Sequence, residues 1–498
     1  MLSAVKEDLK EEEVLSGLRA VIKDGIASQA MVTFTGGAFL VAFALKLGAS
    51  NVVIGLLAAI PPLAQLIQIP SIFLVEKIRK RRSISMFGSG VSRLFWLFIA
   101  VTPLFFPPQA RLTALIGALV LQATFGAVSN SSWNSWMRDL VPQDRLGSFY
   151  SKRMSLSMAL AIPLGLAAGM YIDYWKRLFP QHEIYGYSML FFLGFLVGML
   201  GVYFISTIPE PLMPPPQGRS EFLRMILQPF RDANFKSLIM FLGSWNFAVN
   251  LAAPFFTVYM LKRLELGMTF IIALTMLSQI MNLAFLHIWG RFSDQFSNKS
   301  VLGVSGPLFI ACILAWTFTT MPEKYVLTVP LLIAIHIFMG ISMAGVTLAS
   351  GNIGLKLAPK GQATAFLAAN SVVNSLAAGI APILGGKFAD FFAGRELAWT
   401  LKYTGPGREL ILPTLNLQQW DFFFFLAFLV GLYSIHRLAM VKEIGEVEEK
   451  IVIQELISEV RRRMIDVSSV GGLRQMLNFP FSVARQLTLF RNSEEEHR

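Results

Sequence analysis

The stretch Leu140-Val141-Pro142-Gln143, followed by Phe149, recurs 217 residues later as Leu357-Ala358-Pro359-Lys360, followed by Phe366. Three other pairs of landmarks have nearly the same separation: Leu45-Lys46 and Leu261-Lys262 (216), Glu76 and Asp294 (218), and Asp173 and Asp390 (217). A constant offset between unlike landmarks is expected of an internal repeat. The sequence therefore predicts a chain built from two copies of one unit.

Each copy contains six apolar runs, each long enough to cross a hydrocarbon layer of about 30 Å as a helix. The first six lie near residues 26–45, 52–75, 84–106, 112–136, 154–174 and 185–207, and the second six near 237–261, 266–289, 301–321, 326–350, 364–392 and 420–439. Because each copy has an even number of spans, both copies lie the same way up in the membrane. The predicted fold class is an all-α integral membrane protein with twelve transmembrane helices in two six-helix halves.

Composition excludes a large soluble domain. Of the 498 residues, 54% are apolar and only 15% charged, with a mean hydropathy of +0.57. Twelve spans of about 20 residues use nearly all of the apolar residues, so a catalytic domain of about 100 residues has no place. We therefore expect no enzymatic activity, no cofactor and no metal site. The sequence also lacks the Gly-rich phosphate loop of ATP-hydrolysing transporters.

The spans divide the chain into five parts: an N-terminal segment (1–22), an N-terminal six-helix bundle (23–208), a central loop (209–236), a C-terminal six-helix bundle (237–440) and an amphipathic tail (441–498). Loops after even-numbered spans hold 17 Lys and Arg residues, against 10 after odd-numbered spans. This bias predicts that both termini and the central loop are cytoplasmic. The expected location is the plasma membrane, as a multi-pass protein of a bacterial inner membrane.

The net charge of +12 comes mainly from basic residues between the spans. That pattern favours contact with anionic membrane lipid and argues against nucleic acid as a partner. In the tail, Ile444, Val447, Ile451 and Leu456 form a helical apolar stripe, which predicts an amphipathic helix from Val441 onward. Two readings stay open for this tail: a segment resting on lipid or in solvent, and a segment with a regulatory partner. A monomer is expected.

The loops after spans 2 and 8 carry a recognisable motif. The second copy reads Gly290-Arg291-Phe292-Ser293-Asp294-Gln295-Phe296-Ser297-Asn298-Lys299, and the first runs from Ile72 through Glu76-Lys77-Ile78-Arg79-Lys80-Arg81. With the repeat and the span count, this resembles the major facilitator superfamily, whose loop motif has a glycine, three residues, an acid, basic residues and a second glycine. The first copy keeps the acid and the bases but lacks both glycines.

The resemblance implies a cytoplasmic gate made by Glu76, Lys77, Gly290, Arg291 and Asp294. Both acids lie at helix C-terminal ends, where the helix dipole disfavours negative charge by about 0.3–1 kcal/mol. The resemblance implies compensation at the start of another helix, near Gln362 for Glu76 and near Ser148 for Asp294. The alternative is that the acids only neutralise neighbouring Lys and Arg. A Gly-rich run, Ala381-Pro382-Ile383-Leu384-Gly385-Gly386, is interpreted as a site of close helix packing.

Asn and Gln residues within spans indicate which helices face the interior, because an amide in lipid is costly. Spans 3, 6, 9 and 12 contain none, and these are the peripheral helices of the family that the chain resembles. The predicted solute-binding residues are neutral hydrogen-bonding groups with aromatic neighbours, which suit an uncharged polar or amphiphilic solute: Gln65, Asn130, Trp133, Asn134, Trp245, Asn246, Asn250, Gln279 and Asn374. Amides that join helices to one another are an equal alternative.

Few titratable groups fall within the spans. His336 in span 10 and Asp24 in span 1 are the proton-coupling candidates, since histidine titrates near neutrality; a structural histidine is equally compatible with the sequence. Arg93 in span 3 is interpreted as structurally paired. The predicted function is secondary active transport of a small solute by alternating access, coupled to protons. The alternative is a transporter-like protein that binds lipid or acts in assembly without moving solute.

Overall fold

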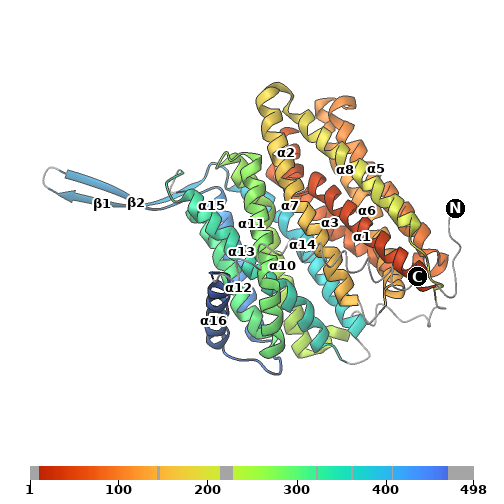
Figure 1. The fold of residues 1–498 in the computed structure, drawn as a ribbon. Coiled ribbons are helices and arrows are strands. Elements are labelled where there is room, and N and C mark those ends of the chain that lie inside the picture. The colour runs from red at the N-terminus through yellow and green to blue at the C-terminus, as the bar shows by residue number, and fades with distance from the viewer. Residues whose placement is uncertain are drawn as a thin grey trace.

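The computed structural model describes residues 10–142, 146–213, 228–320, 324–359, 363–405 and 408–468. Within these ranges twelve helices are long and apolar enough to cross a membrane, six in each half of the chain, as the repeat predicts. Figure 1 shows the two halves beside each other, the first in red to yellow and the second in green to blue. The two halves of the chain therefore form two bundles of helices.

The N-terminal half contains α1 (Glu11–Thr35), α2 (Gly37–Lys46), α3 (Asn51–Ala64), α4 (Gln68–Ile78), α5 (Arg81–Phe105), α6 (Pro108–Leu140), α7 (Leu146–Leu178) and α8 (Glu183–Thr207). The C-terminal half contains α10 (Ala233–Lys262), α11 (Met268–Gln295), α12 (Asn298–Ala315), α13 (Thr328–Leu357), α14 (Ala363–Phe391) and α15 (Trp420–Ala439). A hairpin, β1 (Glu396–Gly405) and β2 (Arg408–Gln418), precedes α15, and α16 (Glu449–Ser468) follows it.

Span 1 differs from the continuous helix expected at 26–45. Its helix begins earlier, at Glu11, because Glu11, Glu12 and Glu13 occupy the first turn, where the positive end of the helix dipole favours acids. The span then breaks at Gly36, which is extended, and Gly37, which has φ +55°. Only glycine adopts that left-handed conformation without strain, so Gly36 and Gly37 determine where span 1 breaks.

Span 2 is also interrupted. Pro61 and Pro62 lie inside α3 and lack the N–H groups that a continuous helix needs. A short 3-10 helix, Gln65–Ile67, joins α3 to α4. At the end of α4, Arg79 has φ +57° at the position where the loop motif of the family has its second glycine. A non-glycine residue in this conformation costs roughly 1–2 kcal/mol.

The hairpin between spans 11 and 12 was not expected. β1 and β2 pair antiparallel, with Glu396 opposite Gln418 and Gly405 opposite Arg408. Figure 1 shows the hairpin projecting sideways from the helical body. The available signal was the alternation of polar and apolar residues in this segment, together with the sequence Gly405-Pro406-Gly407 within it.

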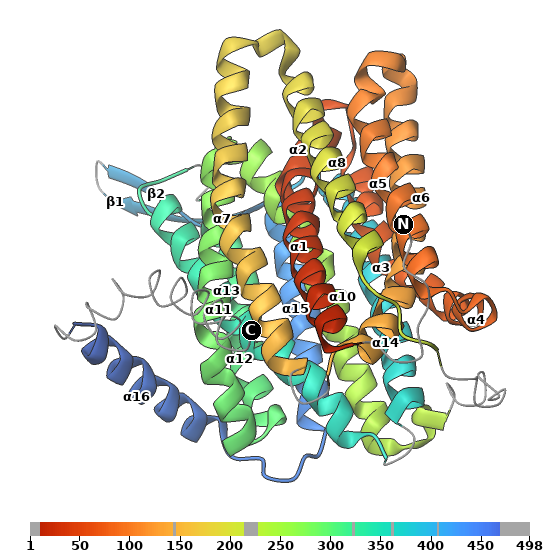
Figure 2. The ribbon, with the colours of Figure 1, turned by 45° about the vertical axis from the view of Figure 1, so that its right-hand side comes forward.

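The tail helix starts at Glu449, later than the expected Val441, because residues 441–448 form a non-helical connection with Gly445 at φ +90°. This connection is bonded to the C-terminal half. Glu443 accepts hydrogen bonds from the Lys299 N–H (2.7 Å) and the Asn298 amide (3.0 Å), and pairs with Lys356 at 2.8 Å. Figure 2 shows α16 lying beside one end of the bundle.

Two further ion pairs attach the tail. Glu446 pairs with Lys299 at 2.7 Å, and Glu459 of α16 pairs with Arg291 of α11 at 2.6 Å. Burial alone would raise the pKa of Glu443, but the hydrogen bonds from Lys356, Asn298 and the Lys299 N–H hold that pKa below its ordinary value. Because the pKa of Glu443 is lower in the folded protein than in the unfolded chain, its ionised carboxylate stabilises the docked tail at pH values above the unfolded pKa. This stabilisation is lost as the pH falls through the folded-state pKa.

We expect Glu443→Gln to release the tail at neutral pH, because it removes a charge that accepts three hydrogen bonds. A loss of about 2 kcal/mol corresponds to roughly a 30-fold change in the docked population. The measurement is the rate of trypsin cleavage after Lys450 in the purified protein. The exposed neighbour Glu448 provides the control variant Glu448→Gln, which should leave that rate unchanged. Equal rates in the two variants would contradict the docking role of Glu443.

Candidate functional site

The two halves meet through hydrogen bonds at one end of the bundle. We call the end at which α7 and α14 finish and α3 and α11 begin the distal end, and the opposite end the proximal end. Near the end of α7, Asp173 accepts hydrogen bonds from the N–H of Met268 (2.9 Å), the N–H of Thr269 (2.8 Å) and the Thr269 hydroxyl (2.6 Å). The first N–H groups of a helix have no partner within the helix, so Asp173 of one half caps α11 of the other.

Asp390 makes the matching contact in the second copy. Near the end of α14, its carboxylate accepts from the side-chain amide of Asn51 at 2.7 Å and from the N–H of Val52 at 3.3 Å. It therefore caps α3 of the N-terminal half. Asp173 and Asp390 are the pair that the repeat aligns, 217 residues apart. We call these two contacts the distal latches.

Close backbone packing continues from the latches. A Cβ on Gly55 of α3 would lie 2.0 Å from the Pro382 carbonyl oxygen, and a Cβ on Gly386 of α14 would lie 2.4 Å from the Asn51 carbonyl oxygen. Only glycine fits at both positions. The Gly-rich run at the end of span 11 therefore serves helix packing, as its small residues indicated.

A cavity of about 360 Å³ lies between the halves, next to the latch on α3. Its size falls in the range of small-molecule sites, about 300–1,000 Å³. Residues from both halves line it: Gly36, Gly37, Leu40, Val41, Ile54, Leu57, Ala58, Ile60, Pro61, Trp96, Leu119, Gln122, Ala253, Pro254 and Thr257. Its walls are apolar except for Gln122, Thr257 and the indole of Trp96.

None of the predicted solute-binding residues lines this cavity, but some continue its walls. On α10, Asn250 precedes Ala253 by three residues. The exposed Gln65, at the start of the 3-10 helix that follows α3, comes four residues after Pro61. Residues three or four apart share a helix face. These amides therefore lie toward the proximal end from the cavity.

The α10 amides are partly satisfied by their own helix. Asn246 donates to the Leu242 carbonyl and Asn250 to the Asn246 carbonyl, each at 2.8 Å. This leaves their side-chain oxygens as acceptors. On α14, the side-chain oxygen of Asn374 is buried and has no hydrogen-bond partner among the described residues.

The remaining predicted solute residues lie farther along the helices from the cavity. Asn130 and Asn134 are exposed on α6, and Gln279 is half-buried on α11. Trp133 lies under the Arg153 guanidinium, 5.9 Å from the ring centre. Trp245 is buried within the C-terminal half, with its ring 5.6 Å from Phe309, which is the placement of a core residue.

His336 is buried in the C-terminal half. Its Nδ1 lies 2.8 Å from the Leu332 carbonyl of its own helix, and its ring packs edge-on against Trp316 at 5.6 Å. It does not line the cavity between the halves. This geometry is that of the structural histidine that the sequence left as an alternative.

Asp24 lies in a buried charge cluster within the N-terminal half. Its carboxylate is 3.3 Å from Arg93 and 3.8 Å from Arg153, and it accepts a hydrogen bond from Ser28 at 3.1 Å. Arg93 also donates to the Gly198 carbonyl at 2.6 Å. The Arg93 guanidinium is therefore paired, as a cation inside a span must be.

The predicted gate residues lie at the proximal end. The side chains expected to contact them lie outside the described residues. Glu76, Lys77 and Asp294 are exposed, whereas the side chains of Ser148 and Gln362 lie outside the described residues. Asp294 borders a proximal pocket with Asn352 and Lys356. Gly290 lies on α11 beside Arg291, which is paired with the tail through Glu459.

The first copy of the motif is anchored by Arg81, which is fully buried. Its N–H donates to Glu210 at 2.5 Å, and its guanidinium donates to the carbonyls of Ser135 (3.0 Å) and Pro211 (2.8 Å) and pairs with Asp139. These contacts join α5, α6 and the start of the central loop.

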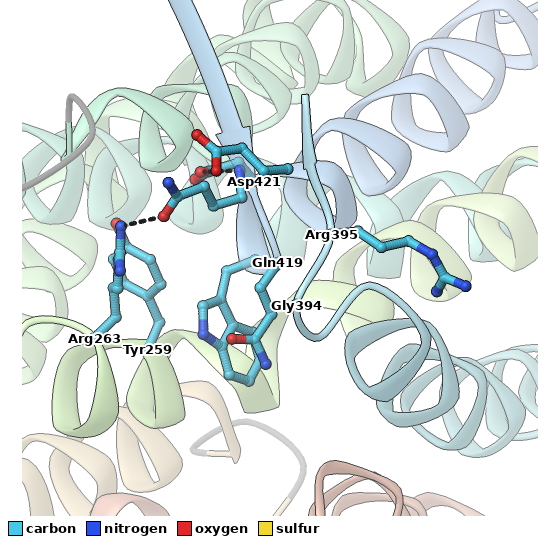
Figure 3. Close-up of a pocket in the computed structure, with 9 residues that line it drawn as sticks. Tyr259, Arg263, Gly394, Arg395, Gln419 and Asp421 are labelled. Atoms are coloured by element: carbon cyan, nitrogen blue, oxygen red, sulfur yellow. Dashed lines mark hydrogen bonds between the residues drawn. The ribbon is translucent and has the colours of Figure 1, made fainter. Parts of the chain in front are cut away.

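A second, polar cavity of about 240 Å³ lies at the base of the hairpin. Figure 3 shows Tyr259 and Arg263 together at the end of α10, facing Asp421, with Arg395 directed away from them. Arg263 donates to the Gln418 side chain at 2.7 Å, and Asp421 accepts from the Gln418 N–H at 3.0 Å. This cavity could not be predicted from the sequence, because the hairpin that forms it was not predicted.

The described residues contain no group of three or more His, Cys, Asp and Glu side chains that could hold a metal ion. No curated protein sequence matches the chain.

The family profile described as the Major Facilitator Superfamily matches residues 25–382. Among solved structures, the chain is similar to a mutant of the nucleoside transporter NupG, with 13% identity and a TM-score of 0.63 over 86% of this chain and 100% of that one. It is also similar to a D-xylose-proton symporter, with 12% identity and a TM-score of 0.62 over 88% and 99%. The TM-scores show a shared fold, and at these low identities they show no more than that.

Asp24→Asn should destabilise the protein, because it leaves Arg93 buried without its counter-charge. Breaking a buried ion pair costs about 3–5 kcal/mol, so the thermal unfolding temperature in detergent should fall. Adding Arg93→Met to this variant removes the unpaired charge and should recover most of the loss. If Asp24→Asn unfolds at the normal temperature, the cluster has no structural role, and proton coupling becomes its better explanation.

Proposed function

The chain belongs to the Major Facilitator Superfamily, and we propose that it is a secondary active transporter that moves a small uncharged or amphiphilic solute by alternating access. The family consists of transporters, and no enzymatic role is proposed. Membership and the twelve spans make the chain a multi-pass membrane protein. We further propose that the proximal end faces the cytoplasm of a bacterial cell, as the Lys and Arg bias indicates, and that the protein works as a monomer.

The observation that carries this proposal is the pair of distal latches. Each latch joins the C-terminal end of a helix in one half to the N-terminal end of a helix in the other. Opening a path at the distal end therefore requires both caps to break, which makes the distal end a gate. The gate residues Glu76 and Asp294 are proposed to make the corresponding contacts at the proximal end in the opposite state, so that the halves rock between two sets of caps.

The amides proposed to bind solute are those that continue the cavity walls, above all Gln65, Asn250 and Asn130. The oxygens of the α10 amides are free to accept hydrogen bonds, since the N–H groups of Asn246 and Asn250 are used within their own helix. Neutral groups of this kind select for uncharged hydrogen-bonding solutes.

Proton coupling is proposed at Asp24 or at His336. Asp24 has the stronger support, because two arginines share one carboxylate there and a change in its charge would alter the contacts between α1, α5 and α7. Lipid is proposed as a second partner, at the basic loops and the tail.

The transport proposal is tested by flux in reconstituted vesicles. Purified protein in proteoliposomes is given a panel of radiolabelled solutes that includes a nucleoside, a pentose and an amphiphilic alcohol, with and without a proton gradient. Saturable uptake that exceeds protein-free vesicles, and that responds to the gradient, is expected for at least one uncharged solute. If the protein binds lipid but moves no solute in the panel, the alternative role in lipid binding or assembly becomes the better one.

Asp173→Asn should favour the state that is open at the distal end, because it removes the charge that accepts three hydrogen bonds from α11. A loss of about 2 kcal/mol shifts a two-state population by more than tenfold. With the single cysteine replaced (Cys312→Ser), Asn134→Cys reports the proximal side and Thr257→Cys the distal side. Labelling by an impermeant maleimide should slow at the proximal reporter and accelerate at the distal one.

Asp390→Asn should act in the same direction. Glu265→Gln changes an exposed acid at the same end and provides the control, with unchanged labelling. The side from which each reporter is labelled in sealed cells also tests the orientation. Latch variants that label like the parent at both reporters would contradict the role of the latches as a gate.

A further inference from the structure

The cavity between the halves differs in character from the amides predicted to bind solute. Of its lining residues, only Gln122 and Thr257 carry an amide or hydroxyl group, and these come from opposite halves. Neither side chain has a hydrogen-bond partner among the described residues. The other walls are aliphatic or aromatic. An apolar cavity with a few polar groups is suited to a ligand that is mostly hydrocarbon.

The break in span 1 extends this cavity to a helix expected at the periphery. Gly36 and Gly37 lie on its wall, and a Cβ on Gly37 would meet no atom within 4 Å. With no side chain at this break, Trp96 of α5 also lines the cavity. The absence of amides placed span 3 among the lipid-facing helices, but Trp96 of this span supplies an aromatic wall of the cavity.

Polarity changes along the same helix faces. On α10 the face runs from Thr257 and Ala253 to Asn250 and Asn246, and on α6 it runs from Leu119 and Gln122 toward Asn130. Residues three or four apart lie one above another on a helix. The distal part of the path is therefore apolar and the proximal part is lined by amides, with about 1.5 Å of path per residue.

We propose that this cavity binds the hydrocarbon part of an amphiphilic solute, whose polar group points toward Asn250 and Gln65. Trp96 limits the size of the hydrocarbon part, whereas the glycine break adds space for it. The role of this cavity in transport rests on the proposed function, whereas the binding of an amphiphilic molecule in the cavity does not depend on flux. It narrows the solute class from uncharged or amphiphilic molecules to those with a substantial apolar portion.

The test uses 3-azioctanol, an alkyl alcohol that forms covalent adducts on illumination, with the full-length protein in lipid nanodiscs. Adducts are mapped by mass spectrometry after digestion. We expect saturable adducts in the peptides that contain Leu57, Trp96 and Ala253, with protection by excess 1-octanol. Adducts at lipid-facing residues should rise linearly with concentration and should not be protected.

Ala253→Phe fills the cavity and should reduce the protected labelling at least tenfold. Ala284→Phe makes the same change at an exposed alanine of α11 outside the cavity and should leave it unchanged. Asn250→Ala should weaken protection by 1-octanol about fivefold, because the amide oxygen that receives the hydroxyl is lost. If Ala253→Phe does not give monodisperse protein, Ala58→Leu serves the same purpose.

Adducts confined to lipid-facing residues, or protected labelling that persists in both cavity variants, would overturn the inference. The outcome is separable from that of the flux experiment. A protein that shows protected labelling but no flux contradicts the transport proposal and supports the cavity. A protein that shows flux without protected labelling supports transport and contradicts the cavity.

Discussion

Two carboxylates, Asp173 and Asp390, cap helices that belong to the opposite half of the molecule, and the relation between the halves depends on these contacts. The first turn of a helix has N–H groups with no partner inside the helix, and in a membrane protein few other groups can satisfy them. A carboxylate from another element meets this need with both charge and hydrogen bonds. The same physical requirement recurs in the tail, where Glu443 bonds to the N–H of Lys299 in the first turn of α12. Helix ends are thus the points at which separate parts of this chain are joined.

The sequence could predict the parts of the structure that depend on composition and repetition. Twelve apolar runs with a constant offset indicate two bundles of six helices. In the sequence, Asp173 and Asp390 served only as landmarks that align the two copies, and their role in the latches was not predicted. The sequence could not predict their partners, because a cap depends on the distance between two helices and leaves no periodic signal. The breaks in spans 1 and 2 were missed for a related reason. Gly36-Gly37 and Pro61-Pro62 both weaken a helix, but only packing decides whether the helix bends, breaks or continues.

The candidate site also combines features that residue types predict with features that depend on packing. Amides within spans predict a polar path, since lipid excludes them, but the apolar cavity beside them has the composition of any buried surface. Leu57 and Ala253 look like core residues in the sequence, and only their position between two halves makes them cavity walls. Conversely, Trp245 stands beside Asn246 in the sequence but packs against Phe309, because neighbouring residues on a helix point about 100° apart. Hydrogen-bonding capacity can be read from residue type, whereas the volume left between helices cannot.

The hairpin makes the two copies of the repeat unequal at the distal end. Between α7 and α8 the first copy has only the short connection that contains residues 180–182, whereas the second copy has two strands of 10 and 11 residues at the equivalent place. The two copies therefore differ in the connection that follows their fifth span. The pseudo-twofold axis that relates the helices therefore does not extend to the surface at the distal end. Any molecule that approaches the protein from that side meets two unlike surfaces, one with the hairpin and one without it.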